Sequence, residues 1–479
     1  MMPNKLYYTT LFCLLILLPI VTQAQSYKKK TVAFLEEHQD TYRELALDIW
    51  NYAELGYQEN KSAQALQDEL KKAGFIIESG VADIPTAFVA SYGSGEPVIG
   101  ILGEYDALPG LSQAAVPERE ILVEGAAGHA CGHHLFGVAS AASAIAMKEW
   151  LASNRKSGTV KFFGTPAEEG GSGKVYMVRA GLFDDVDVVL QWHPSSANDA
   201  SPGTTLANKS GKFRFYGEAS HAAFAPERGR SALDGVEAMN YMVNMMREHT
   251  EESSRIHYVI TKGGDAPNVV PNFAEVYYYV RHKDVAEVKD MWNRLVNAAE
   301  GAAQGTDTRV EVEVVGGVYN ILPNETLSEV MYENLQFVGG VEYDAEEKTF
   351  AEKISETFGK NAVDLSIAQE IQPRQMREGK ASSDVGDVSW AVPTVGLGTA
   401  TWVPGTSAHS WQAVAAGGTS IGIKGMMVAA KTMALTGIEL FQKPNVIDEA
   451  QQEFAQRRGE GFQYEALIGD REPPLDYRK

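Results

Sequence analysis

Residues 129–134 (HACGHH) place one cysteine and three histidines directly before an alanine-rich stretch that starts at Leu135. Thiolate sulfur and imidazole nitrogen are typical ligands of zinc and related ions. Gly132 has no Cβ, so the backbone can turn sharply enough for Cys131 and His133 to converge on one ion. The stretch from Leu135 is predicted to be a helix, whose N-terminus would favour the thiolate form of the cysteine. The pattern therefore predicts a metal site, against the alternative of a buried cysteine beside surface histidines.

The N-terminal residues 1–24 have the composition of a secretory signal peptide, with Lys5 before the apolar run 11–18 and a small-residue site ending at Ala24. We expect cleavage after Ala24 and a secreted or periplasmic protein. Cys13 lies inside the predicted signal peptide, so Cys131 would be the only cysteine of the mature chain. Metal ligation would explain a solitary thiol in an oxidising compartment.

The charge balance limits the class of partner. The chain of 479 residues carries a formal net charge of -21 at pH 7. An excess of carboxylates repels phosphate, which argues against nucleic acid or anionic lipid as a partner. Beyond the signal peptide, no stretch is predicted to span a membrane. The length exceeds that of a single hydrophobic core, so two domains are expected.

Helical and strand-type patterns alternate along 25–207 and again along 321–440, which predicts an α/β catalytic domain with a central mixed sheet flanked by helices. Helices are expected at 32–54, 62–73, from 135 and at 417–440. Strands are expected at 75–77, 86–92, 98–102, 160–164, 186–191 and 394–397.

Potential ligands follow several of these strands, at the edge where open α/β sheets keep their sites. The groups are Glu104 and Asp106 after 98–102, Glu168 and Glu169 after 160–164, His193 after 186–191, and His409 after 394–397. A single histidine in such a place is ordinarily structural, whereas repeated placement on one sheet predicts a shared metal site. Adjacent glutamates point in different directions, so one can bind a metal while the other handles a proton.

Residues 208–320 follow a different pattern, which predicts an inserted domain. Strands at 211–216, 256–261, 274–281 and 309–315 and helices at 231–248 and 285–303 give the order β-α-β-β-α-β of a ferredoxin-like unit. Residues 441–479 form a polar C-terminal extension, for which we expect a partly ordered surface segment.

Seven motifs occur in order between about residues 51 and 440: YAELGYQE, EYDALPG, HACGHH, PAEEGG, SHAAFAPERGRSALDG, NVVPN and GTSAHSWQ. They resemble the dinuclear metallopeptidase family of hippurate hydrolases, auxin-conjugate amidohydrolases and aminoacylases, with p-aminobenzoyl-glutamate hydrolases as the nearest match. The resemblance implies two divalent metal ions held by Cys131, as a bridging thiolate, with His133, Glu169, His193 and His409. Thiolate and imidazole favour zinc, with manganese, cobalt or nickel as alternatives.

The resemblance also implies roles for other residues. Glu168 would be the general base, and Asp106 would orient a ligand histidine. The inserted domain 208–320 would be a lid and dimerisation domain, from which His221 would reach the oxyanion across the interface of a homodimer. Asn268 and Arg281 would hold a carboxylate of the substrate, for which the arginine fork is suited.

Three residues depart from the family pattern or fall outside it. His134 stands where many relatives have aspartate, Glu104 also replaces an aspartate, and His129 has no assigned role. Either histidine would be an extra ligand, a group supporting a ligand, or a surface residue. The role of Glu104 stays open.

The predicted function is metal-dependent hydrolysis of the amide bond in N-acyl or N-aroyl amino acids, such as p-aminobenzoyl-glutamate. One alternative is a metal-free amidase with Cys131 as the nucleophile, which would leave Glu169, His193 and His409 without a role. Another is a secreted metal or ligand carrier without turnover, which would leave Glu168 without a role.

Overall fold

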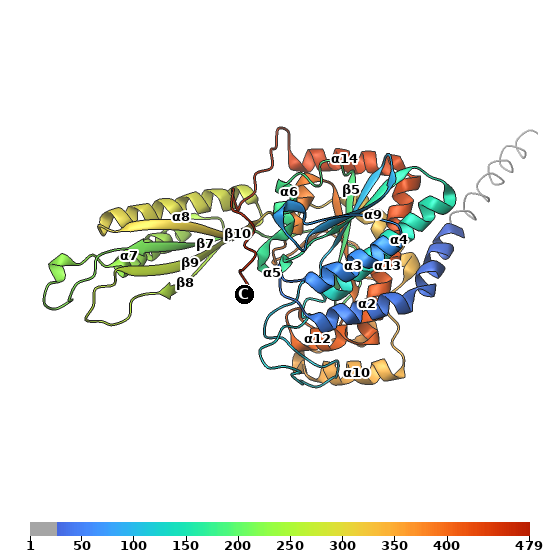
Figure 1. Ribbon diagram of the computed structural model, residues 1–479, viewed down its shortest axis with the longest axis horizontal. Coiled ribbons are helices and arrows are strands. Elements are labelled where there is room, and N and C mark those ends of the chain that lie inside the picture. The colour runs from blue at the N-terminus through green and yellow to red at the C-terminus, as the bar shows by residue number, and fades with distance from the viewer. Residues whose placement is uncertain (1–25) are drawn as a thin grey trace, which may run out of the picture.

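Two large β-sheets organise the protein, whose computed structural model describes residues 26–479. A third sheet consists only of the short strands β6 Gly203–Thr204 and β11 Arg377–Glu378. Figure 1 shows an α/β part that contains both ends of the described chain and an elongated part that projects from it. The predicted signal peptide, 1–24, lies outside the described residues.

The larger sheet has the strand order β1-β2-β4-β3-β5-β12. Its strands are β1 Ile76–Ser79, β2 Phe88–Ser94, β3 Val98–Gly103, β4 Gly158–Gly164, β5 Val188–Ser195 and β12 Thr394–Ala400. β3, β4, β5 and β12 run parallel, while β1 and β2 are antiparallel to their neighbours. The predicted α/β fold with a mixed central sheet is therefore confirmed. The four parallel strands bring their carboxyl ends to one edge, where the candidate ligands lie.

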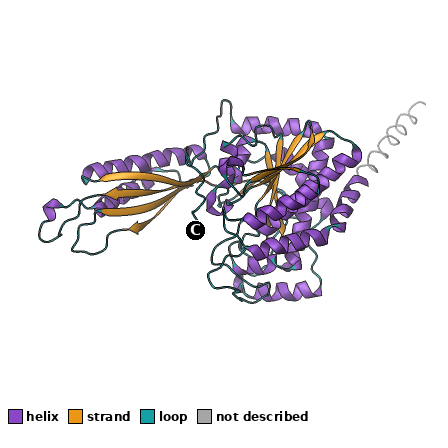
Figure 2. Ribbon diagram, viewed as in Figure 1, coloured by secondary structure: helices purple, strands orange, loops and turns teal. Residues whose placement is uncertain are grey.

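Two buried helices pack against each other and against this sheet, α4 His133–Asn154 and α13 Ser420–Gln442 (Figure 1 and Figure 2). Their many alanines and glycines allow this close approach: a Cβ at Gly437 would lie 2.3 Å from Met147 Cε. Among the described residues, α13 alone is long and apolar enough to cross a membrane. It is buried over most of its length, as the core helix of a folded domain is.

The remaining helices of this part cover the sheet and its loops. They are a helix over residues 26–37, α2 Gln39–Tyr52, α3 Asn60–Lys72, α5 Glu168–Gly171, α6 Gly173–Arg179, α9 Glu325–Val338, α10 Ala345–Glu356, α11 Val385–Ala391, α12 Trp411–Gly417 and α14 Pro444–Arg458. No element was predicted for the region of α9 to α11. The prediction that a strand ends before His193 is wrong, since β5 continues through it.

The projecting part has a four-stranded antiparallel sheet in the order β10-β7-β9-β8. Its elements are β7 Ala207–Tyr216, α7 Ala232–Met246, β8 Arg255–Lys262, β9 Phe273–His282, α8 Val285–Gly305 and β10 Arg309–Val318. The side chains between sheet and helices form a hydrophobic core of their own. β8 is an edge strand, paired within the described chain only to β9.

The C-terminal extension, 441–479, packs into the protein interior more than expected of a partly ordered surface segment. α14 buries Ile447, Ala450 and Phe454. Further on, Ala466 and Ile468 join the core of the α/β part, whereas Leu467 between them joins the core of the projecting part. The segment therefore packs into both parts of the molecule.

Candidate active site

The loops after β4 and β12, the end of β5 and the start of α4 bring two groups of potential metal ligands together, and the loop after β3 contributes to a third. One group is Cys131, His133 and His193, and the other is Cys131, Glu169 and His409. Within each group the ligand atoms lie within 4.8 Å of one another. Cys131 belongs to both groups, which is the arrangement expected of a thiolate shared by two cations.

Hydrogen bonds direct the Nε2 atoms of two of these histidines toward the candidate metal site. His133 Nδ1 lies 2.7 Å from Asp106 Oδ1, and His193 Nδ1 lies 2.7 Å from the carbonyl oxygen of Pro194. Each Nδ1 therefore carries the hydrogen that it donates, so Nε2 is the atom that would offer a lone pair to a metal once its own proton has left. Burial alone would lower the pKa of both rings, but without a metal, nearby negative groups, the Cys131 thiolate first among them, raise it. His193 Nε2 points to the shared sulfur, 3.5 Å from Cys131 Sγ.

Asp106 links the two ligand groups. While Oδ1 accepts from His133, Oδ2 accepts a 2.9 Å hydrogen bond from the backbone N–H of Glu169. One buried carboxylate thus orients an imidazole of one group and the backbone that carries the carboxylate of the other.

The donor set fits divalent metal ions. Burial raises the pKa of the Cys131 thiol, but the neighbouring His133 and His193 more than offset this effect, and the pKa falls to about 6. Above pH 6 the sulfur is mainly the thiolate that a metal requires. His133 Nε2 and Glu169 Oε1 are buried and form no hydrogen bond, and they lie 3.0 Å from Glu104 Oε2 and 3.1 Å from His409 Nε2, respectively. Such a cluster of ligand atoms is suited to surround a cation.

Glu168 belongs to a third group of potential ligands, with Glu104 and His133. Burial and the negative charges of Glu104 and Glu169 raise the pKa of Glu168 well above its ordinary value. A carboxylate of raised basicity beside a metal site is suited to accept a proton at neutral pH.

A buried lysine beneath the site was missed by sequence reasoning. Lys174 Nζ lies 2.7 Å from Glu104 Oε1 and 2.7 Å from Asp384 Oδ1. Burial alone would lower the pKa of Lys174, but the two carboxylates raise it, so the ammonium stays charged. Lys174 thereby balances part of the negative charge around Glu168. Its position at the start of α6 gave no local signal, because Asp384 lies 210 residues away.

His129 and His134 are both buried, so a surface role is excluded for each. His129 Nε2 donates to the carbonyl of Ile49, and His134 Nε2 donates to that of Gly417, both at 3.0 Å. Burial lowers the pKa of both rings below the ordinary value, so both are neutral. Neither belongs to a ligand group of the described residues.

The predicted residues of the inserted domain do not lie together. The loop that carries His221 follows β7 at the end of the sheet remote from the α/β part, and Ala222 N–H donates to the Asn268 carbonyl there. β9 starts at Phe273, close to this loop, and Arg281 lies near its other end. About 27 Å of strand therefore separates Arg281 from Phe273. Within one chain, Arg281 is near the linkers and His221 and Asn268 are remote from the ligand groups.

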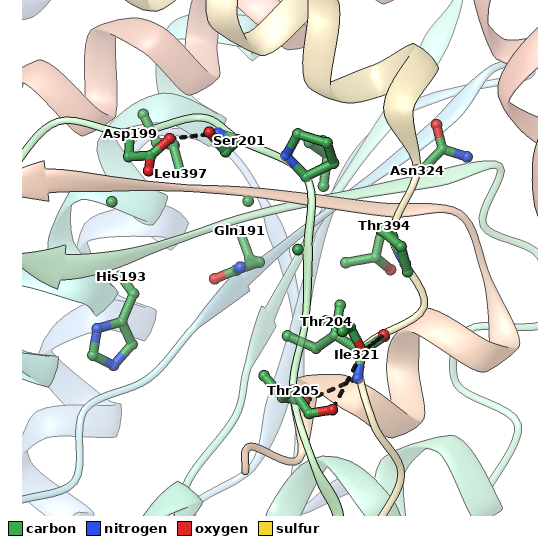
Figure 3. A pocket seen from close by; sticks show the side chains of 16 residues that line it. Gln191, His193, Asp199, Ser201, Thr204, Thr205, Ile321, Asn324, Thr394 and Leu397 are labelled. Atoms are coloured by element: carbon green, nitrogen blue, oxygen red, sulfur yellow. Dashed lines mark hydrogen bonds between the residues drawn. The ribbon is translucent and has the colours of Figure 1, made fainter. Parts of the chain in front are cut away.

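A cavity of about 300 Å³ lies beside β5 and β12 and is lined mainly by the two linkers, 199–205 and 321–324. Figure 3 shows Gln191, Thr204 and Thr394 around it, with His193 at one corner. Of the predicted metal ligands, only His193 lines it. The cavity is thus next to the ligand groups and separate from Glu168.

Comparisons with known proteins agree with this geometry. Residues 100–413 match the family described as peptidase family M20/M25/M40. The chain is 42% identical to one of the subunits of the p-aminobenzoyl-glutamate hydrolase of Escherichia coli over 449 residues, covering 88% of this chain and 93% of that protein. It is 29% identical to the Xaa-Arg dipeptidase of Mus musculus over 443 residues, covering 89% and 92%.

Solved structures share the fold. An aminobenzoyl-glutamate utilization protein from Klebsiella pneumoniae has a TM-score of 0.61 at 19% identity and covers 87% of this chain and 99% of its own. A dinuclear metal-binding peptidase from Bacillus subtilis has a TM-score of 0.59 at 16% identity, covering 85% and 99%. The family match and the relatives identify an amidohydrolase of the metallopeptidase type. The chain belongs to peptidase family M20/M25/M40.

Proposed function

We propose that the protein hydrolyses the amide bond of N-acyl or N-aroyl amino acids, including substrates like p-aminobenzoyl-glutamate, with two divalent metal ions. The observation that carries this proposal is the pair of ligand groups sharing Cys131, with Glu168 beside them. The name of the Escherichia coli relative supports the substrate class.

In the proposed reaction, Glu168 accepts the proton of the attacking water and later delivers it to the leaving nitrogen. When bound, two divalent ions supply the Lewis acidity that activates this water and polarises the scissile carbonyl. Asp106 keeps His133 and the Glu169 backbone in place, so the ligands need little rearrangement. Zinc is the favoured metal for a thiolate and imidazoles, with manganese, cobalt and nickel as alternatives.

A substrate screen tests this proposal. The purified protein is stripped by a chelator, reloaded separately with zinc, manganese, cobalt or nickel, and assayed on N-acyl and N-aroyl amino acids including p-aminobenzoyl-glutamate. Hydrolysis that requires metal is the expected result. Hydrolysis by the stripped protein would favour the Cys131 nucleophile, and metal binding without turnover on any substrate would favour a carrier.

Arg281 is proposed to bind a carboxylate of the substrate. Its Nε is buried without a hydrogen-bond partner, and the guanidinium lies 5.4 Å from the centre of the Tyr279 ring. Arg281→Lys keeps the charge and loses the paired N–H donors of the guanidinium. The value of kcat/KM for a carboxylate substrate should therefore fall, by an amount that corresponds to about 2 kcal/mol of transition-state binding. An amide lacking the carboxylate is the control. An equal loss on both substrates would contradict the assignment.

His221 is proposed to stabilise the oxyanion of a partner chain in a homodimer formed through the inserted domain. Its Nδ1 accepts hydrogen bonds from the backbone N–H groups of Ala223 and Phe224, at 3.2 and 3.1 Å. The remaining nitrogen therefore carries a hydrogen to donate. Tyr258, Val259 and Ile260 are exposed on the edge strand β8, which supports pairing with a second chain. In such a dimer, His221 and Asn268 of one chain would join Arg281 of the other.

His221→Ala should lower kcat at least a hundredfold with metal retained, since such a donor contributes roughly 3 kcal/mol. Co-expression of Glu168→Ala chains with His221→Ala chains provides the test of sharing. Mixed dimers would hold one intact and one doubly damaged site, restoring about a quarter of the activity under random pairing. Verified mixed dimers with no gain over the parents would exclude a shared site. Because the Escherichia coli relative is named as one subunit of its enzyme, a different partner chain is the alternative to a homodimer.

We also propose export to the periplasm or medium, supported by the composition of residues 1–24. N-terminal sequencing of the protein recovered from fractionated cells should begin at Gln25. A cytoplasmic protein that keeps residues 1–24 would contradict this.

A further inference from the structure

The turn that carries Glu168 and Glu169 has an unusual backbone conformation. Ala167 and Ser172, at its two ends, have φ of 57° and 58°, and Gly170 has φ of 92°. Non-glycine residues adopt such angles at a cost and keep them only where surrounding contacts hold them. The direction of the two glutamate side chains therefore depends on whatever fixes this turn.

Contacts from the interior fix part of it. Glu59, which is buried, accepts a 2.8 Å hydrogen bond from Ala167 N–H, and Asp106 accepts one from Glu169 N–H. The Tyr57 hydroxyl donates to the Gly171 carbonyl at 2.6 Å. These bonds hold the two ends of the turn and one N–H at its centre.

The carbonyl group of Glu169, at the centre of the turn, is held by residues from the C-terminal end of the sequence. The Tyr477 hydroxyl and Arg478 Nη2 both donate to the Glu169 carbonyl oxygen, at 3.0 and 2.8 Å. The Tyr477 ring packs edge-on against Tyr57, with centroids 5.6 Å apart. A Cβ at Gly56 would lie 2.2 Å from the Tyr477 hydroxyl, so only glycine permits this approach.

We name residues 466–479 the C-terminal strap, because contacts along its length fix where its end lies. Ala466 and Ile468 are buried in the core of the α/β part. Arg179 donates to the carbonyls of Gly469 and Arg471, both at 2.8 Å. Further on, Gln58 Nε2 donates to the Leu475 carbonyl at 2.9 Å. In Figure 1 the strap runs between the two parts and ends close to α5.

We infer that Tyr477 and Arg478 are positioning residues, which hold the Glu169 carbonyl and so direct the side chains of Glu168 and Glu169. This inference rests on the proposed function for the roles of the two glutamates. Neither strap residue is assigned a contact with substrate, so their loss should reduce kcat and leave KM nearly unchanged. The turn would relax from its strained conformation. The proposed base, Glu168, and the proposed ligand, Glu169, would then lose their alignment.

The test uses side-chain variants of the full chain. Tyr477→Phe removes one donor, Arg478→Met removes the other with similar bulk, and the double variant removes both. Lys479→Met is the matched control, since this exposed lysine is adjacent and loses the same charge without a side-chain bond to the turn. Arg478→Lys keeps the charge and a donor, so it should recover part of the function.

Hydrogen exchange of the metal-free protein is the first measurement, because it needs neither substrate nor metal. Exchange of the amides in 168–173 should speed up about tenfold in the double variant, from the loss of two hydrogen bonds, and stay unchanged in β4. Normal exchange in the turn would overturn the inference. A similar increase in β4 would also overturn it, because the effect would then be a general loss of stability.

Metal content and kinetics complete the test. Dialysis against a weak chelator should remove one metal ion more readily from the double variant than from wild type or Lys479→Met. On an amide that the wild type hydrolyses, kcat should fall about tenfold for each single variant, with KM within about threefold. If the wild type hydrolyses no amide, the proposed function fails, while the exchange result still decides the role of the strap.

Discussion

Glu168→Gln should lower kcat by at least about a hundredfold while the protein keeps both metal ions. Glutamine has the size of glutamate and cannot accept a proton at neutral pH, so the variant removes general base catalysis, which contributes about 10²–10⁴ in rate. The raised pKa of Glu168 strengthens this expectation, because it matches the carboxylate to proton transfer near neutral pH. The measurement is kcat together with metal content per chain.

The adjacent residue provides the matched control for this prediction. Glu169 contacts His409, with Oε1 3.1 Å from Nε2, and belongs to a ligand group that includes Cys131. Glu169→Gln should therefore lose one metal ion as well as activity. Loss of metal from the Glu168 variant with retention in the Glu169 variant would show that the two roles are exchanged.

Removal of metal should abolish turnover and expose Cys131 to alkylation. The sulfur is buried among ligands, and a coordinated thiolate is a poor nucleophile toward added reagents. In the stripped protein, the pKa of about 6 keeps the sulfur mainly ionised at pH 7, so alkylation should be fast there. The rate should fall as the pH drops through 6, because the thiol form then predominates. Mass spectrometry of the alkylated chain measures both states.

The only other cysteine of the sequence, Cys13, lies in the predicted signal peptide, so the modified residue of the mature protein is unambiguous. Restoring the metal before alkylation should restore protection and activity together. Rapid alkylation of the fully loaded, active enzyme would contradict metal ligation by Cys131 and favour its role as a nucleophile.

The sequence by itself determined the α/β class and the residue types that meet at the sheet edge. Apolar runs such as 98–102 and 160–164 are local signals of buried strands, and parallel strands bring their carboxyl ends together. Hence Cys131, Glu169 and His409 were candidates before their distances were known. The family resemblance, resting on seven motifs, then suggested the role of each.

Only the tertiary structure decided what supports these residues. Lys174 reaches Asp384, and Arg478 reaches the Glu169 carbonyl, across 210 and 309 residues of sequence. Likewise, the separation of His221 from the ligand groups follows from how the inserted domain projects from the α/β part. Contacts of this kind leave no periodicity or spacing in the sequence, because packing of distant segments creates them rather than any local conformational preference.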